Sequence, residues 1–496
     1  MTDLNLTRRT LLSGAGLSVA GLGTGALTAP AEAATLQGSL PRRVDVVVVG
    51  GGISGLVAAR RVAERGRSVL LVEARRRVGG RVLNHHLKSH AVIESGGAFV
   101  GPTAGHILRL AKELGVPTFK EYVDGKSVYV SSTTGRLEYE GTIPPDPTIL
   151  PDAAQLLTRI DQYASEIPVD APWTHPSARE WDGQTLGEWI RRNAINSEGV
   201  ENLIRCWTQP GFGADPSELS FLYVLWYIAC SGDERHVGTF ARNSETTNGA
   251  QERRFVGGSQ LIPLRLARRL GDIVALAAPV RRITQGDGHA VVHTARGRVR
   301  ARRVIVAAPP PLVLDIDWNP QLPRRRTELL RHLDMGQLMK CDAVYRRPFW
   351  REAGLNGFGL NDSGAVRVAF DNCPRDGDPG VLLAFVGGST WRRYGVQTRE
   401  ARRAAVLRGF AEMFGDKALD PIEYVEHDWT REQWTTGGPV ANYAPGTMIR
   451  FGREIRQPHG RVHWAGTETS TYWTGYMDGA VRAGKRAATE VLERLS

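Results

Sequence analysis

The strongest constraint on the fold lies near the N-terminus, where a run of β-branched residues is followed at once by spaced glycines. Val46–Val49 is typical of a strand buried on both faces of a parallel sheet. Gly50, Gly52 and Gly55 then give the spacing G-x-G-x-x-G. In this spacing the first glycine permits a tight turn, the second lets backbone approach a pyrophosphate, and the third lets a helix pack closely on the strand. The pattern predicts an α/β fold with a dinucleotide-binding unit.

The residues that follow complete this unit. Residues 53–66 are predicted to form a helix, whose N-terminal N–H groups and dipole suit phosphates. A second strand, Ser68–Val72, ends at Glu73. That position is about twenty residues past the glycines, where an acid is expected to bind ribose hydroxyls. An acid there argues against a 2′-phosphate, but the unit alone does not distinguish NAD from FAD.

Two pairs of glycines follow, Gly79–Gly80 and Gly96–Gly97, with Arg81 directly after the first pair. Such pairs indicate backbone that passes close to an extended cofactor, with Arg81 free to meet a phosphate. Two ordinary glycine turns and a surface arginine explain the composition equally well.

Five motifs, in this order along the chain, together resemble the flavin-containing amine oxidases and most of all the monoamine oxidases. They are Gly50–Gly55 with Glu73, Arg77–Arg81, Gly96–Thr103, Gln251–Ser259 and Ala465–Val481. The resemblance implies a discontinuous Rossmann-like FAD-binding domain with an inserted α+β substrate-binding domain. It also implies oxidative deamination of a primary or secondary amine to an imine and then an aldehyde. Hydride would pass to flavin N5, with reoxidation by O2 giving H2O2.

The resemblance assigns roles to individual positions. FAD contacts are expected at Gly50, Gly52, Ser54, Gly55, Glu73, Arg81, Gly97, Val256, Glu468 and Met477. Tyr476 falls on one wall of the aromatic cage that faces the flavin ring, and Trp473 lies beside it in sequence. We expect these two aromatic residues at the reacting site.

Two departures from the family pattern concern the flavin attachment and the cage. Members that bind FAD covalently carry a cysteine after a Gly-Gly pair, whereas Pro439 follows Gly437–Gly438 here, so FAD is expected to be noncovalent. Val440 stands at the second cage position. The cage therefore lacks its second aromatic wall unless Trp434 or Tyr443 supplies it. We include Val440 and Trp434 with Tyr476 as candidate substrate contacts.

A third departure concerns the electron acceptor. The family has a lysine near flavin N5, and an ungapped match across Asp315–Pro323 places Asp315 at that position. This match leaves two acceptors open, oxygen in an oxidase or another acceptor in a dehydrogenase. Lys340 is equally compatible with a cation near the cofactor and with a lysine at a strand edge.

Length and composition indicate a soluble enzyme of two domains, since the chain has 496 residues, 42% of them hydrophobic and 23% charged. Residues 219–229 form an apolar aromatic segment that either lines a substrate path or packs in the core. The predicted FAD-binding domain comprises residues 40–118, 235–308 and 436–496, and the substrate-binding domain residues 119–234 and 309–435.

The N-terminus predicts export. Arg8 and Arg9 form a twin-arginine pattern, and an uncharged stretch followed by Ala31-Glu32-Ala33 completes a cleavable signal over residues 1–33. The predicted location is periplasmic or extracellular. No apolar tail precedes Ser496, so we expect no membrane anchor.

The charge distribution and the cysteine, histidine and metal-ligand patterns limit the kinds of molecule that the chain is expected to bind. The net charge of +11 comes mainly from scattered arginines without interleaved aromatics, which favours a solvated surface over nucleic-acid binding. Four cysteines lack C-x-x-C spacing, so idle thiols are expected, with a disulfide as the alternative. His85, His86 and His90 lack partners for a metal site. The expected partners are an amine and an electron acceptor, and a homodimer is compatible with the sequence.

Several other functions remain open. An L-amino-acid oxidase needs an arginine clamp for a carboxylate, and a polyamine oxidase needs acids in its pocket. A flavin desaturase would share the FAD-binding fold but not the arrangement of Tyr472–Asp478. A flavoprotein that binds FAD without catalysis is the non-enzymatic alternative.

Overall fold

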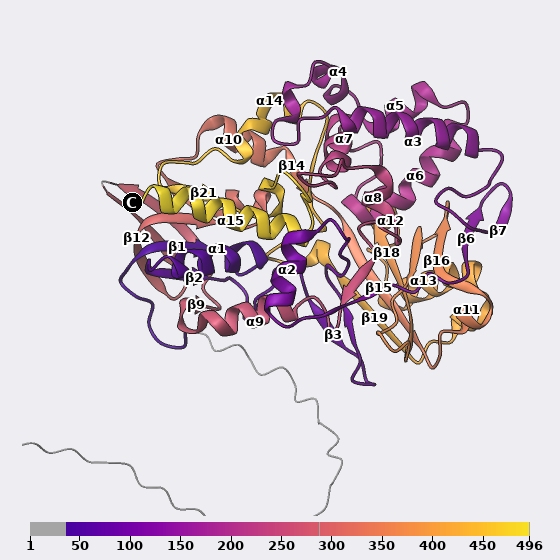
Figure 1. Cartoon of the computed structure of the whole chain (residues 1–496), viewed down its shortest axis with the longest axis horizontal. Helices are drawn as coiled ribbons and strands as arrows, with labels where there is room; N and C mark the ends of the chain where they lie inside the picture. The colour runs from indigo at the N-terminus through magenta and orange to yellow at the C-terminus, as the bar shows by residue number, and fades with distance from the viewer. Residues whose placement is uncertain (1–35, 287, 496) are drawn as a thin grey trace, which may run out of the picture.

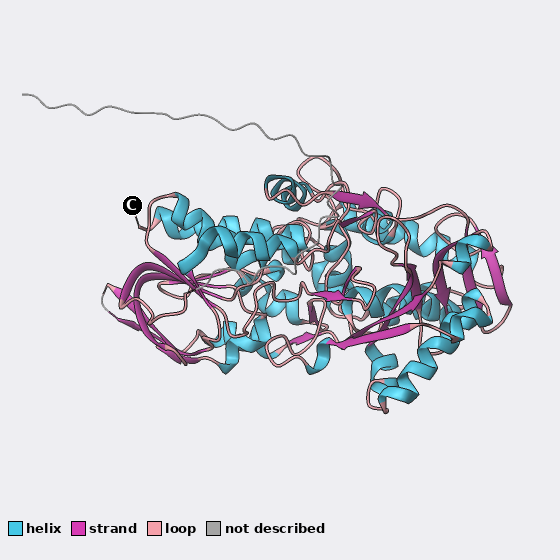
Figure 2. Cartoon of the chain, turned by 90° about the horizontal axis from the view of Figure 1, so that it is seen from below, coloured by secondary structure: helices cyan, strands magenta, loops and turns pink. Residues whose placement is uncertain are grey.

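Two β-sheets lie in separate lobes of the molecule, with helices around and between them (Figures 1 and 2). The computed structural model describes residues 36–286 and 288–495. The export signal predicted for residues 1–33 lies outside the described residues. The parallel strand pairs of the first sheet confirm the expected Rossmann-like α/β fold. Residues of both lobes line one cavity.

The first sheet is the expected cofactor sheet. Its strands run in the order β13-β10-β11-β12-β1-β2-β9, and β21 also pairs with β12. The pairs β1–β2, β1–β12 and β12–β21 are parallel. The strands are β1 Arg43–Val49, β2 Val69–Val72, β9 Val274–Ala275, β10 Val280–Gly286, β11 His289–Thr294, β12 Gly297–Val306, β13 Asp317–Asn319 and β21 Val462–Trp464.

Helices pack closely on this sheet because glycines remove side chains at the contacts. A Cβ at Gly55 would lie 2.0 Å from the oxygen of Gly50, and one at Gly484 would lie 2.3 Å from the oxygen of Ser54. The first contact joins a helix to its strand, and the second joins two helices. The helices of this lobe are α1 Ile53–Glu64, α2 Gly105–Glu113, α9 Leu261–Leu270 and α15 Met477–Glu493.

The second sheet has the order β19-β15-β18-β17-β16-β6-β7. All residues of β15 are buried, and Met339 and Cys341 pack with Phe410 of α13 on one face. The strands are β6 Lys126–Ser131, β7 Gly135–Tyr139, β15 Leu338–Tyr345, β16 Leu355–Asn361, β17 Val368–Asp371, β18 Gly380–Gly387 and β19 Glu423–Asp428.

A layer of helices covers the other side of the cavity, and among the described residues three pairs of short strands lie outside the two large sheets. The helices of this layer are α3 Leu150–Ser165, α4 Ala178–Asp182, α5 Leu186–Asn193, α6 Ser197–Phe212, α7 Phe221–Ala229 and α8 Phe240–Ser244. The helices α11 Phe349–Glu352, α12 Gly388–Tyr394 and α13 Arg399–Phe414 contact the second sheet, and α10 Arg324–Arg331 packs with α14 Thr447–Phe451. The paired short strands are β3 Asn84–His86 with β4 Val92–Glu94, β5 Thr118–Lys120 with β8 Arg253–Phe255, and β14 Leu333–Met335 with β20 Ala441–Tyr443.

One predicted domain boundary differs from the structure. Asp317–Asn319 falls in the range 309–435 that the sequence assigned to the substrate domain, but it forms β13 and pairs in parallel with β10 of the cofactor sheet. Three residues of strand carry too weak a pattern to be recognised.

The four cysteines are buried free thiols. Among the described helices, none has the length and apolarity needed to cross a bilayer.

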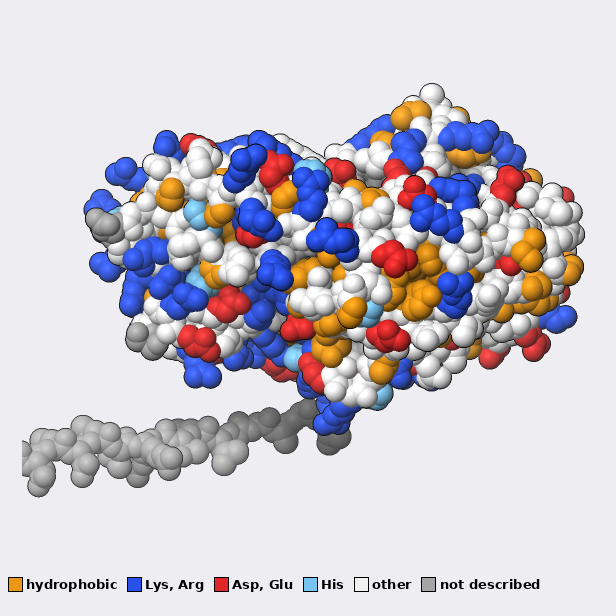
Figure 3. All heavy atoms as spheres, turned by 90° about the horizontal axis from the view of Figure 1, so that it is seen from above, with side chains coloured by type: hydrophobic (Ala, Val, Ile, Leu, Met, Phe, Trp, Pro, Cys, Tyr) orange, Lys and Arg blue, Asp and Glu red, His pale blue; other side chains and the backbone are white. Residues whose placement is uncertain are grey.

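On the face drawn in Figure 3, Lys and Arg side chains are more numerous over the left end, the cofactor lobe, than over the right end. Lys and Arg side chains are spread over that face, with acidic side chains between them.

Candidate active site

A cavity of about 880 Å³ begins at the carboxyl ends of β1, β2 and β12 and continues between the second sheet and the helical layer. The carboxyl end of a parallel sheet is where α/β folds bind their ligands. The positions assigned to FAD that line the cavity are Gly50, Gly52, Ser54, Glu73, Arg81, Gly97 and Met477.

The N-terminus of α1 is open toward this cavity. Gly52 is its N-cap residue, and no side chain caps the helix. A Cβ placed at Gly52 would have no atom within 4 Å, whereas one at Gly50 would lie 2.9 Å from the oxygen of Ala307. Uncapped N–H groups at a helix N-terminus bind anions. The cradle therefore fits the pyrophosphate of a dinucleotide.

Glu73 lies at the end of β2 with 4% of its surface exposed. Its Oε2 accepts from the N–H of Gly51 at 2.5 Å, and its Oε1 accepts from the N–H of Arg75 at 2.8 Å. Each carboxylate oxygen can accept more than one hydrogen bond. Glu73 is thus held rigidly and keeps acceptor capacity for a ribose.

Arg81 is held by a partner that does not itself line the cavity. Its Nη1 donates to Glu468 Oε1 at 2.5 Å and to the oxygen of Pro439 at 2.8 Å, and its Nη2 donates to Glu468 Oε2 at 3.1 Å. Glu468 is 3% exposed and lies behind Arg81. The bidentate pair fixes the guanidinium plane. Glu468 therefore positions Arg81 at the cavity wall.

Two predicted positions serve other roles or lie elsewhere. Gly55 is covered by Gly50, so it provides the close helix–strand contact rather than cavity wall. Val256 does not line the cavity; its N–H donates to the oxygen of Pro117 at 2.9 Å. Val280 at the start of β10 lines the cavity instead. The motif around Val256 indicates the family but not which valine reaches the cavity.

Tyr476 lines the cavity where the cofactor part meets the substrate part. Its ring centroid lies 5.8 Å from that of Tyr227, which also lines the cavity. Burial raises the pKa of Tyr476 to about 12, so the phenol is neutral at physiological pH. Trp473 packs edge-on behind Tyr476 with centroids 4.9 Å apart, but it is 1% exposed and is not part of the cavity wall. The expectation that Trp473 acts at the reacting site is therefore wrong, because its side chain does not reach the cavity.

The residues considered for the second cage wall lie elsewhere. Val440 is 1% exposed and lies behind Gly475. Tyr443 packs on Tyr223, with centroids 5.1 Å apart. Trp434 lines the cavity, but at the end near Glu73, where the guanidinium of Arg281 lies 5.4 Å from its ring.

The second aromatic ring of this part of the wall, beside Tyr476, is that of Tyr227 of α7. This helix corresponds to the aromatic segment 219–229, and its residues are buried. Tyr227 alone among them reaches the cavity. Most of the segment packs in the core and one residue lines the cavity, so the two expectations, core packing and a substrate path, each hold in part. The sequence pattern did not identify which aromatic residue lines the cavity.

Lys340 lines the cavity from a buried strand, so we infer that it, in place of Asp315, is the lysine that the resemblance implies near the flavin. Asp315 is exposed at the rim of the cavity. Lys340 lies in the middle of β15, is 2% exposed, and donates from Nζ to the oxygen of Gly96 at 3.1 Å. No other lysine in residues 36–286 or 288–495 lines the cavity. Lys340 follows the Asn319-Pro320 motif after α10 and β14, whereas the ungapped match placed the lysine before this motif.

The substrate part of the cavity is walled mainly by apolar and aromatic side chains. Its wall includes Phe99, Leu203, Trp207, Phe240, Phe358, Phe370 and Phe385. Among the described residues, the acids that line the whole cavity are Glu73, Glu140, Glu245 and Asp315. Glu140 is exposed, and Glu245 accepts a hydrogen bond from Thr142 in the adjoining loop.

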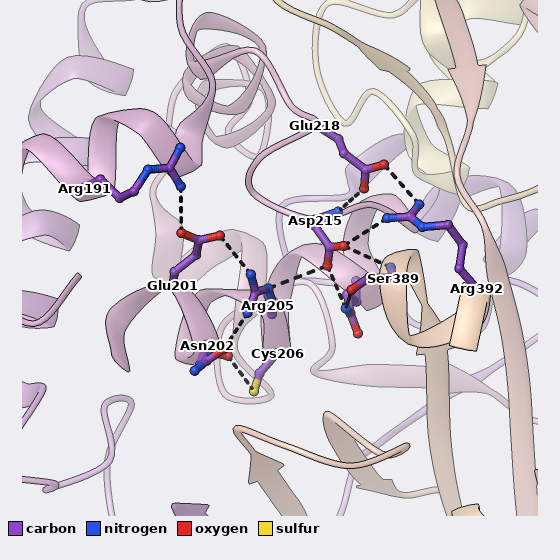
Figure 4. Close-up of polar contacts among 10 residues, drawn as sticks. Arg191, Glu201, Asn202, Arg205, Cys206, Asp215, Glu218, Ser389 and Arg392 are labelled. Atoms are coloured by element: carbon purple, nitrogen blue, oxygen red, sulfur yellow. Dashed lines mark hydrogen bonds and ion pairs between the residues drawn. The ribbon is translucent and has the colours of Figure 1, made fainter. Parts of the chain in front are cut away.

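Ion pairs on the outer side of α6 fix this wall (Figure 4). Glu201 bonds Arg205 at 2.9 Å and Arg191 of α5 at 3.0 Å. Asp215 bonds Arg392 of α12 at 3.2 Å. Leu203 and Trp207, on the same helix, line the cavity. The network holds α6 between α5 and α12 and so fixes the position of its apolar face.

Comparison with known proteins decides the family. The model for "Flavin containing amine oxidoreductase" matches residues 53–492. The chain belongs to this family.

Relatives that match over most of the chain support this family assignment. A putative flavin-containing monoamine oxidase, AofH of Mycobacterium tuberculosis, is 41% identical over 91% of this chain and 97% of the relative. Flavin-containing amine oxidase A of Canis lupus familiaris is 38% identical over 91% of this chain and 85% of the relative.

Two solved structures share the fold. Wild-type putrescine oxidase bound to putrescine has a TM-score of 0.86 at 34% identity, covering 93% of this chain and 100% of the other. Cyclohexylamine oxidase from Brevibacterium oxydans IH-35A has a TM-score of 0.85 at 34% identity, covering 91% and 99%.

As a flavin-containing amine oxidoreductase, this chain binds FAD and oxidises CH–NH groups. The open N-terminus of α1, the rigid carboxylate of Glu73 and the guanidinium of Arg81 fit the pyrophosphate and ribose. Pro439 lines the cavity at the position where covalent members carry cysteine, so FAD is held noncovalently.

Proposed function

We propose that this chain oxidises primary monoamines with an apolar chain or ring to the imine, which hydrolyses to the aldehyde, and that O2 is the electron acceptor. The observation that carries the substrate class is the apolar and aromatic wall beyond Tyr476, where Glu140 and Glu245 are the acids among the described lining residues and no arginine contributes.

An amine reacts only when its nitrogen lone pair is free. An alkylammonium ion with a pKa near ~10.4 needs about 4–5 kcal/mol to lose its proton at pH 7. An apolar cavity lowers this cost because burial disfavours the charged form. Tyr476 and Tyr227 supply ring faces without a charge, since burial raises the pKa of both phenols. Bound FAD supplies the acceptor for the hydride.

Lys340 supports oxygen as the acceptor. A buried ammonium at the wall, beside the expected position of the flavin ring, would stabilise negative charge as O2 is reduced. Two electrons and two protons convert O2 to H2O2. A dehydrogenase would have no need of this cation.

Diamines are the second candidate substrates. Glu140 and Glu245 line the cavity, and either could pair with a distant ammonium group. One solved relative is a putrescine oxidase bound to putrescine. Amino acids are less favoured because the arginines of the lining, Arg75, Arg81 and Arg281, belong to the cofactor part.

An anaerobic screen tests the substrate class. The FAD-loaded protein is mixed with benzylamine, pentylamine, putrescine or leucine, and the flavin absorbance is followed before and after air is admitted. We expect rapid bleaching by benzylamine and pentylamine, with H2O2 released in air. Faster bleaching by putrescine would favour the diamine, and absence of bleaching by any amine would overturn the proposal.

We propose further that the chain is exported by the twin-arginine pathway to the periplasm or the extracellular space. The pair Arg8-Arg9 and the segment Ala31–Ala33 support this location. Replacement of both arginines by lysine should retain the protein in the cytoplasm. Light scattering on the exported product gives its oligomeric state, for which a homodimer is the expected result.

A further inference from the structure

Five ionisable side chains are buried together behind the part of the cavity wall that carries Lys340. They are Lys340 and Asp342 of β15, Glu94 of β4, Glu121 after β5, and Arg254 of β8, and each has at most 8% of its surface exposed. The cluster holds two cations and three acids. Such a buried group must be paired internally, since isolated charges are strongly disfavoured there.

Lys340 and Asp342 lie on one face of β15 because residues two apart in a strand point to the same side. Lys340 is anchored through its Nζ, which donates to the oxygen of Gly96 at 3.1 Å. Asp342 is anchored by Asn372, whose Nδ2 donates to its Oδ1 at 2.8 Å. Asn372 Oδ1 has no hydrogen-bond partner in the part of the chain that the structure describes.

The other two acids are bound to Arg254. Its Nε donates to Glu121 at 2.7 Å, its Nη1 donates to Glu94 at 3.3 Å, and its Nη2 donates to the oxygen of Cys373. Asp342 has no hydrogen bond to this guanidinium among those formed by the described residues. It is therefore the carboxylate best placed to balance Lys340.

The described residues that lie opposite Lys340 in the sheet are not acids. His427 of β19 lies opposite Lys340 in register, and burial lowers its pKa, so it is neutral at pH 8. On the other side, Phe385 of β18 lies opposite, with its ring 5.8 Å from Nζ. Burial lowers the pKa of Lys340, and Asp342 is the strongest of the groups that oppose this shift.

We propose that Asp342 is a positioning residue that holds Lys340 as an ammonium ion at the cavity wall and so acts, through Lys340, on electron transfer to O2. The inference rests on the proposed function in taking O2 as the acceptor. Asp342 neither gives nor takes an atom in the reaction. Its carboxylate keeps the cation in place where negative charge builds on oxygen.

The test removes the charge and keeps the shape. Asp342→Asn retains an oxygen for Asn372 Nδ2, and Lys340→Met removes the cation itself. Asp182→Asn is the matched control, because Asp182 is a 1% exposed carboxylate bonded to Ser220 and to the N–H of Ile449, outside the cavity lining. Should Asp342→Asn fail to fold, Asp342→Ser replaces it.

Stopped-flow kinetics give the first readout. In Asp342→Asn, anaerobic reduction by benzylamine should stay within about twofold of wild type, while reoxidation by O2 at pH 8 should slow about tenfold. The loss of reoxidation rate at high pH should begin at least one pH unit lower than in wild type. Lys340→Met should be slow at every pH, and adding Asp342→Asn to it should cause no further loss.

Sulfite binding to the oxidised protein gives a readout without turnover, since a nearby cation favours binding of this anion. The Kd for sulfite, measured from flavin absorbance at pH 8, should rise about tenfold in Asp342→Asn and stay unchanged in Asp182→Asn. A wild-type pH profile and a wild-type sulfite affinity in Asp342→Asn would overturn the inference. If no amine reduces the wild-type protein, the proposed function fails, whereas the sulfite titration still decides the role of Asp342.

Discussion

Arg81 and Glu468 form a two-pronged ion pair at the cavity wall, although 387 residues separate them in the chain. Arg81 follows a glycine pair in the N-terminal part of the cofactor lobe, and Glu468 follows the last strand of the same sheet. The pair therefore connects the two ends of a discontinuous domain at the point where FAD is bound.

Glu468→Gln should lower the free energy of unfolding by about 3 kcal/mol, because it leaves a partly buried guanidinium without its carboxylate. Urea denaturation of the FAD-loaded protein measures the change. Glu138→Gln is the control, since Glu138 pairs at the surface with Arg136 and should contribute less than about 1 kcal/mol. Equal losses in the two variants would contradict the buried role of Glu468.

Gly52→Ala should weaken FAD binding at least about tenfold while leaving the fold intact. The added methyl group meets no protein atom within 4 Å, so it projects into the phosphate cradle. Isothermal titration of the apoprotein with FAD measures the affinity. Gly286→Ala, which is equally uncrowded but lies outside the cavity, should bind FAD like wild type. Unchanged FAD affinity in Gly52→Ala would contradict a phosphate-binding role for the N-terminus of α1.

Tyr476→Ala should slow anaerobic flavin reduction by benzylamine about 100-fold, or about 3 kcal/mol in activation free energy. Loss of the ring admits water and removes the apolar surface that favours the neutral amine. Tyr476→Phe keeps that surface and should stay within a few fold of wild type. Tyr472→Ala, close in sequence but outside the lining, is the control. A slow Tyr476→Phe would instead assign the chemistry to the hydroxyl group.

Glu121 should make stability depend on pH. Burial raises its pKa in the folded state to about 7 from an ordinary value of 4.5. Its contribution is therefore fully present below about pH 4.5 and is lost as the pH rises through about 7, by at most about 3 kcal/mol. The difference in unfolding free energy between wild type and Glu121→Gln, measured by urea denaturation from pH 4.5 to 8, should fall over this range. A pH-independent difference would contradict the shifted pKa.

Much of the cofactor lobe could be predicted because it is encoded locally. The strand Val46–Val49, the three glycines and Glu73 lie within one short segment, and the structure forms β1, α1 and β2 there. Each glycine has a steric role that spacing alone reveals, as the 2.0 Å contact at Gly55 shows. Local sequence therefore determines local geometry in this unit.

The substrate side could not be predicted in the same way because it is assembled from distant segments. Tyr227 comes to lie beside Tyr476 in the cavity wall only after α7 packs beside the C-terminal segment. Lys340 reaches the wall because β15 pairs with β18 and β19, a register that no motif specifies. An aromatic helix and an isolated lysine look the same in the sequence whether they face a ligand or the core.

The last part of the chain, from β21 through α15, completes the binding site that the first hundred residues begin. During synthesis the nascent chain carries α1 and Glu73 long before Glu468 and Tyr476 leave the ribosome. Firm capture of the flavin therefore requires the segment from β21 through α15 to have folded onto the lobe that the first residues begin.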